Sequence, residues 1–415
     1  MGRQIVCVAV SIVGTENSIE GGHPSEVPPV GVRRSTAYFP ELESLRGIAI
    51  LLVYVFHLAG AVDPSGTRPG TVVSPLGAFV RAGHTGVSLF FVLSGFLLGM
   101  SFLIEIAGGR RVVRRDYYMR RALRILPLYY TAVVLGAVYC ARSGADLLRA
   151  VPYFVFMDAA GLAAPLLPFS HVWWSLATEV EFYALLPLLA LFGRTRRGRW
   201  LGCGVLLVYS IVLWAFLTQR LRAPSIDGNL FLAMSIFGRA PLFLCGILAA
   251  WIYLAYGERI RDALAHSAPL RYGGADLALF ATLAGLGLVL QWMVFHGNWA
   301  AEAQLGQICH FLEGVLWTAV LLILLLAPLR SKAVFCNSPL TALGILSYSV
   351  YLWHLPLLVF GVSWLRLAHP GVLVPWTWPM AAAVILLTLV TVLLSAATYR
   401  VVERPFLARK ARIDR

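Results

Sequence analysis

Long apolar runs separated by short polar connections make up most of the chain. A helix needs about 20 mostly apolar residues to cross a hydrocarbon core of roughly 30 Å, and about ten runs reach or approach that length. The pattern therefore predicts an all-α polytopic membrane protein with about ten transmembrane helices. The expected spans are residues 46–62, 86–106, 124–141, 174–193, 200–217, 231–256, 275–296, 308–329, 340–362 and 377–399.

Basic residues concentrate in alternate connections between these spans. The dense clusters lie within 110–124, 194–199, 259–271 and 330–332, and after the last span. Cytoplasmic loops are enriched in Lys and Arg, so both termini are expected to be cytoplasmic. Three parts are expected along the chain: a flexible N-terminal tail at 1–38, one membrane domain at 39–406 and a basic C-terminal tail at 407–415.

The composition narrows the class of protein further. Hydrophobic residues make up 59% of the 415 residues and charged residues only 13%, which excludes an ordinary soluble domain. The net charge of +14 follows from cytoplasmic arginines that also contact anionic lipid, so the lipid bilayer is an expected partner and nucleic acid is not. The six cysteines show no CxxC or histidine-rich spacing, and no metal is expected.

Arg46 and His57 lie eleven residues apart in the first apolar run. Eleven residues turn a helix through three turns plus about 20° and rise about 16 Å, so the two side chains share one face. An imidazole inside a membrane is costly unless it faces a polar cavity. His57 is therefore a candidate general base that accepts the proton of an attacking hydroxyl; the alternative is a histidine hydrogen-bonded between helices. The spacing suits a long ligand with a charged head and a reactive tail.

Three arginines lie at the start of a later span, in the segment RRALRILPLYY. The guanidinium groups of Arg120, Arg121 and Arg124 could bind phosphates through paired hydrogen bonds, as a nucleotide-bearing cofactor requires. The alternative is that they anchor the cytoplasmic end of the span. In the preceding span, GVSLFFVLSGF, Ser94 and the glycine after it permit close approach of an acyl chain or, alternatively, of another helix.

Two glutamates in WWSLATEVEFYALLP are two residues apart. On a helix, Glu179 and Glu181 point about 200° apart and cannot serve one site together. Glu179 shares a face with Ser175 and Tyr183, so it is the better cavity candidate. It could orient an imidazole or bind a sugar hydroxyl, or it could pair with an arginine such as Arg239. Arg239 itself is either functional or a residue anchored at the membrane boundary.

A late polar stripe runs through GILSYSVYLWHLP. Ser347, Tyr351 and His354 fall at i, i+4 and i+7, so they share one helical face. A structural hydrogen-bond network is the alternative to a functional site. Either arrangement needs an interior or wet environment in a membrane span.

The order of these motifs is more specific than any single one. From about residue 40 to 406 the chain resembles the membrane-bound acyltransferase-3 family. The resemblance rests on Arg46-x10-His57, GVSLFFVLSGF, RRALRILPLYY, WWSLATEVEFYALLP, RAPLFLCG, LSYSVYLWHLP and VVERPF.

The resemblance implies about ten spans around a cavity and an acyl-CoA-dependent O-acyltransferase in a bacterial cytoplasmic membrane. It implies that the Arg46–His57 pair is essential and that the arginines of RRALRI serve the cofactor region. It also places the two glutamates in one family motif, and Ser347, Tyr348 and His354 in another. We expect acyl-CoA to enter from the cytoplasm with its thioester directed toward His57.

The expected enzyme functions differ in the molecule that carries the acceptor hydroxyl. The first expectation is a macrolide or other glycosylated natural product, because the chain resembles stand-alone actinomycete enzymes and its arginine-rich composition indicates a GC-rich genome. The alternative is an O-acetyltransferase for exopolysaccharide, lipid-linked glycan or cell-wall sugar. A transporter or flippase is the alternative from another class, but the chain shows no inverted repeat of the kind transporters have.

Overall fold

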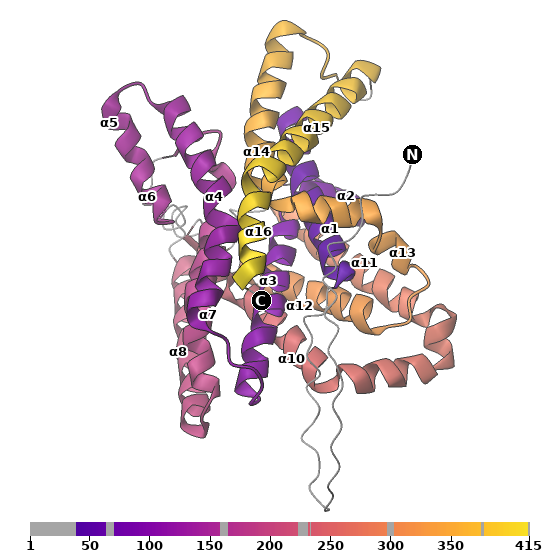
Figure 1. Ribbon diagram of the computed structural model, residues 1–415. Coiled ribbons are helices and arrows are strands. Elements are labelled where there is room, and N and C mark those ends of the chain that lie inside the picture. The colour runs from indigo at the N-terminus through magenta and orange to yellow at the C-terminus, as the bar shows by residue number, and fades with distance from the viewer. Residues whose placement is uncertain are drawn as a thin grey trace, which may run out of the picture. The chain divides into compact units, whose positions relative to one another are not determined.

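Helices account for the regular structure of the chain (Figure 1). The computed structural model describes residues 39–63, 70–157, 165–222, 231–232, 234–296, 303–374 and 377–413, and these contain no strand. The predicted tail at 1–38 lies outside the described residues. Most of the predicted basic tail falls within helix α16, Arg404–Ile413.

Ten of the described helices are long and apolar enough to cross a membrane, which confirms the predicted all-α class and the number of spans. They are α1 (Pro40–Val62), α3 (Thr85–Ile106), α4 (Arg114–Cys140), α7 (Trp174–Gly193), α8 (Arg196–Arg222), α10 (Ile236–His266), α11 (Ala275–His296), α12 (Ala303–Leu326), α14 (Ser338–Ala368) and α15 (Trp378–Thr398).

Shorter helices connect these spans or follow the last one. They are α2 (Pro75–Arg81), α5 (Gly144–Leu147), η2 (Leu148–Ala150), α6 (Val151–Phe154), η3 (Ser170–Val172), η4 (Leu270–Gly274), α13 (Lys332–Phe335) and η5 (Tyr399–Glu403). The described parts of the segment 142–173 contact the spans. Tyr129 of α4 donates its hydroxyl to the carbonyl of Tyr153 at 3.1 Å, and Trp173 is fully buried.

Two helices begin well before the apolar runs that predicted them. Helix α1 starts at Pro40, with proline at a favoured first position and two glutamates in its first turn that complement the helix dipole. Helix α4 starts at Arg114, so its arginines lie on the helix itself. Hydropathy detects only the apolar part of a helix, whereas Arg and Glu also favour helical backbone.

Glycines bring two pairs of helices into close contact. A Cβ atom on Gly344 of α14 would overlap the backbone carbonyl of Glu43 on α1, and one on Gly95 of α3 would overlap that of Phe243 on α10. Small residues permit such packing between membrane helices. The α1–α14 contact also joins Ser44 and Thr341, whose hydroxyls are 3.0 Å apart. These contacts place the Arg46–His57 helix directly beside the helix with the late polar stripe.

A buried carboxylate ties together helix ends predicted to be cytoplasmic. Glu105 near the end of α3 accepts hydrogen bonds from Arg114 at the start of α4, at 2.7 and 3.2 Å. It also pairs with Arg194, which follows α7. This connection fixes the end of α4 from which the candidate cofactor arginines project.

Candidate functional site

A pocket of about 90 Å³ lies among α1, α3, α4, α7 and α14. Such a volume holds several water molecules or a small acyl group. Most of the residues singled out from the sequence meet in it, although they come from five helices. Its polar lining is Arg46, Ser94, Arg121, Arg124, Ser175, Glu179, Tyr183, Ser347, Tyr348 and Tyr351, and its apolar lining comes mainly from α3.

Glu179 lies at the centre of the polar side chains of α7. Its Oε1 atom accepts a hydrogen bond of 2.5 Å from Ser94 and another from Tyr183. Ser175, Glu179 and Tyr183 follow one another at intervals of four residues, so α7 presents all three to the pocket. A serine of α3 is thereby linked to a carboxylate and a tyrosine of α7.

Three arginines give the pocket a formal excess of positive charge over Glu179. Arg46 lies 3.5 Å from the carboxylate of Glu43 on its own helix. The guanidinium carbon of Arg121 lies 5.7 Å from the ring centre of Tyr183, and its Nε atom has no hydrogen-bond partner among the described residues. Arg124 completes the group. The arrangement favours an anionic ligand.

His57 and His354 form a pair next to this pocket. The Nε2 atom of His354 lies 3.2 Å from the Nδ1 atom of His57, and His354 is fully buried. Tyr351, which lines the pocket, has its ring centre 5.8 Å from that of His354. Its hydroxyl lies 2.6 Å from that of Ser175 and donates to the carbonyl of Val172. Tyr351 therefore connects the pocket to the imidazole pair.

Besides His57 and His354, three sequence candidates do not line the pocket. Arg120 is half-buried on α4. Glu181 accepts a hydrogen bond of 3.1 Å from the backbone N–H of Ile236, at the start of α10. Arg239 is buried with its guanidinium carbon 5.6 Å from the ring centre of Trp174. The opposite directions of Glu179 and Glu181 agree with the helical geometry expected for residues two apart.

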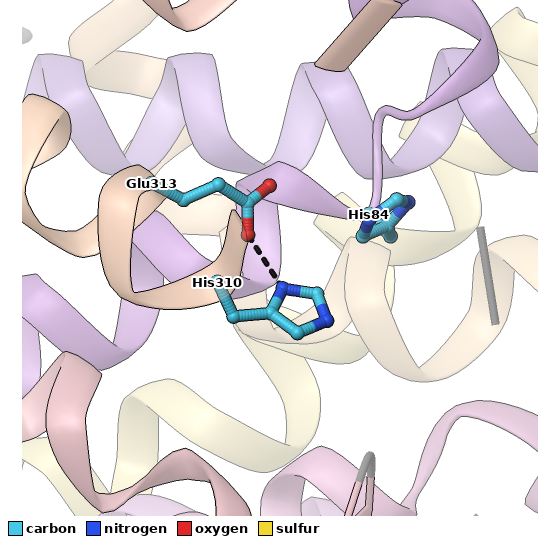
Figure 2. A group of neighbouring side chains, drawn as sticks. All are labelled: His84, His310 and Glu313. Atoms are coloured by element: carbon cyan, nitrogen blue, oxygen red, sulfur yellow. Dashed lines mark hydrogen bonds and ion pairs between the residues drawn. The ribbon is translucent and has the colours of Figure 1, made fainter. Parts of the chain in front are cut away.

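A second polar cluster, absent from the sequence analysis, joins α12 to the start of α3. Figure 2 shows His310 directed toward Glu313, with His84 facing them from the segment before α3. Glu313 Oε2 lies 2.7 Å from His310 Nδ1 and accepts a 2.9 Å hydrogen bond from Ser88. The sequence could have indicated this cluster, because the imidazole of His310 and the carboxylate of Glu313 lie at i and i+3 in an apolar run and share one helical face.

Ligand atoms of His84, His310 and Glu313 lie within 4.8 Å of one another, a spacing that could hold a metal ion. The buried guanidinium of Arg239 already acts on Glu313 electrostatically. A divalent ion would add two positive charges to that environment, which is costly inside a membrane. We therefore interpret the cluster as a charge-balanced hydrogen-bond network, which couples α3 to α12.

Comparisons with known proteins give a consistent result. A family model described as an acyltransferase domain (Acyl_transf_3) matches residues 39–400. The peptidoglycan O-acetyltransferase OatA of Listeria monocytogenes is 23% identical over 401 residues, which cover 90% of this chain and 56% of the relative. The putative peptidoglycan O-acetyltransferase YrhL of Bacillus subtilis is 25% identical over 89% of this chain and 55% of its own.

The putative membrane-bound transacylase BcsY of Komagataeibacter xylinus is 27% identical over 88% of this chain and 82% of its own. The chain thus spans little more than half the length of the first two relatives and most of the third. No solved structure gives a significant match.

Proposed function

The chain belongs to the Acyl_transf_3 acyltransferase family, and on that premise we propose that it is a membrane O-acyltransferase that modifies a hydroxyl of a glycan. The observation that carries the proposal is a pocket among five helices whose lining includes Arg46, Arg121, Arg124 and Glu179. Charged groups within membrane-spanning helices are expensive and mark functional sites. The imidazole pair beside the pocket supplies a base.

The proposed donor is acyl-CoA. Its phosphates are anionic, and the three pocket arginines offer planar guanidinium groups that bind phosphate oxygens in pairs. These arginines lie nearer the helix ends that the distribution of basic residues predicts to be cytoplasmic. The donor would therefore enter from the cytoplasm of a bacterial cell, across whose cytoplasmic membrane the ten helices are proposed to lie.

The proposed reaction uses His57 as the general base. His57 accepts the proton of the acceptor hydroxyl while the hydroxyl oxygen attacks the thioester carbonyl carbon. A C–O bond forms, the C–S bond breaks, and the proton on His57 passes to the departing CoA sulfur. A covalent acyl-histidine pathway would instead release CoA in a rapid burst before the acceptor reacts.

The relatives favour the glycan alternative over the macrolide that the sequence analysis placed first. OatA and YrhL are named for O-acetylation of peptidoglycan, and none of the relatives above is named for a macrolide. The proposed substrate class is accordingly a cell-wall or other polysaccharide with free hydroxyls, acylated at oxygen.

The test is a transfer assay with the purified full chain in lipid nanodiscs. Acetyl-CoA with a labelled acetyl group is supplied together with peptidoglycan fragments or, in parallel, with a macrolide. The proposal predicts free CoA and an equal amount of O-acetylated fragment. Acylation of the macrolide alone would overturn the acceptor class, and failure to consume acetyl-CoA with either acceptor would count against the proposed donor.

A further inference from the structure

Backbone carbonyls determine which nitrogen of His354 carries its proton. The Nδ1 atom lies 2.8 Å from the carbonyl oxygen of Tyr351 and 3.1 Å from that of Val350. Carbonyl oxygens only accept hydrogen bonds, so Nδ1 must be the donor. In the neutral ring of a fully buried histidine, Nε2 then carries a lone pair. That lone pair is directed at His57, 3.2 Å away.

The same logic applies one step further to His57. Its Nδ1 atom lies 2.9 Å from the carbonyl oxygen of Val53, so two acceptors, that carbonyl and His354 Nε2, surround one nitrogen. A hydrogen on His57 Nδ1 can be donated to these two acceptors. Without it, the lone pair on Nδ1 would face the lone pairs of both acceptors. Hydrogen bonding at one ring nitrogen thus sets the state of the opposite one. His57 Nε2 is left unprotonated and able to accept a proton.

We propose that His354 is a positioning residue that holds His57 in the tautomer with a basic Nε2 atom. This inference rests on the proposed function, because it assigns a partner to the base of that reaction. His354 contacts neither donor nor acceptor in this account. Its effect passes through the single hydrogen bond between Nδ1 of His57 and its own Nε2.

The same hydrogen bond strengthens during the reaction. When His57 Nε2 takes the hydroxyl proton, the ring becomes cationic and its Nδ1–H becomes a stronger donor toward His354. Hydrogen bonds to charged groups contribute more than those between neutral groups. An orienting third group behind the base follows the logic of catalytic triads, with a neutral imidazole taking the position that a carboxylate occupies elsewhere.

Two variants of similar volume separate positioning from packing. His354→Gln can place its amide oxygen where Nε2 accepts, whereas His354→Leu fills the space without an acceptor. Loss of a hydrogen bond to a group that becomes charged predicts that His354→Leu lowers kcat about 10- to 100-fold. His354→Gln should stay within a few-fold of the wild type, and KM for acetyl-CoA should change in neither. A kcat for His354→Leu equal to or above that for His354→Gln would overturn the proposal.

A spectroscopic measurement decides the tautomer without requiring turnover. In ¹⁵N-histidine-labelled wild-type protein, the signals that vanish in His57→Ala belong to His57. The proposal predicts a protonated Nδ1 and an unprotonated Nε2 for that ring, retained in His354→Gln. A protonated Nε2 in the neutral wild-type ring would overturn it. A wild-type protein that is inactive in the transfer assay would instead refute the proposed function. The tautomer of His57 would still decide whether His354 positions that ring.

Discussion

Arg46 and His57 share one face of α1, yet they contact different parts of the site. Arg46 lines the pocket with the arginines of α4, whereas His57 lies beside His354 of α14. The helical rise separates the two residues by roughly 16 Å, and Tyr351 bridges the interval through its contact with His354. In the proposed reaction, a single helix would present a cationic group and a base to opposite ends of one ligand.

Arg124 gives a prediction about donor binding. Replacing it with Gln should raise KM for acetyl-CoA about 10-fold or more, because a charge-assisted hydrogen bond to phosphate contributes about 1.5–3 kcal/mol. Arg124→Lys should recover only part of the loss, since an ammonium lacks the planar pair of donors. Arg115, exposed on the same helix, is the matched control. Steady-state kinetics with Arg124→Gln and Arg115→Gln would contradict the assignment if the two KM values were the same.

At the residue scale, helical periodicity predicted the directions of side chains better than it predicted which side chains contact each other. The 200° separation of Glu179 and Glu181 follows from helix geometry alone, and the structure places the two carboxylates in different surroundings. The contact between His57 and His354 joins residues 297 positions apart. No local pattern encodes such a distant contact, because it depends on which helices become neighbours.

At the scale of elements, close packing of α1 against α14 brings the two halves of the site together. Their contact uses glycines at which a Cβ atom would overlap the backbone of the opposite helix. The apolar runs predicted both helices, but neither their adjacency nor the extension of α1 back to Pro40. Adjacency depends on the complementary surfaces of two helices, which a hydropathy pattern does not describe.

Gly344→Ala tests this packing. The added methyl group should destabilise the protein by about 1–3 kcal/mol through overpacking, and it should lower activity by displacing α14 from α1. Gly204 of α8 has no neighbouring atom within 4 Å of the position a Cβ would take. Gly204→Ala should therefore be neutral or slightly stabilising. Thermal unfolding in detergent compares the two variants, and equal loss in both would refute a specific role for the glycine contact.

For the whole molecule, the distribution of charge predicts two functional sides. Arg121 and Arg124 of the pocket lie toward the end of α4 that has abundant basic residues. The segment before α3, which carries His84, lies at the other ends of the spans, as does the connection that follows α14. A donor from the cytoplasm and an acceptor from the opposite side would meet near Tyr351 and His57.

The orientation is open to direct measurement. In a protein whose native cysteines are replaced, Arg110→Cys lies between α3 and α4, and His369→Cys follows α14; both positions are exposed. The account predicts that an impermeant maleimide labels His369→Cys in intact cells with an accessible cytoplasmic membrane. It should label Arg110→Cys only after permeabilisation. The reverse pattern would place the pocket arginines on the outer side and contradict cytoplasmic entry of the donor.

The kcat of the His57→Ala variant tests whether His57 acts as the base. Loss of a general base predicts a fall of about 10²- to 10⁴-fold, with KM for acetyl-CoA little changed and the protein still folded and inserted. His369→Ala, an exposed histidine after α14, should retain wild-type kcat. A His57→Ala protein with near-normal kcat would contradict the account.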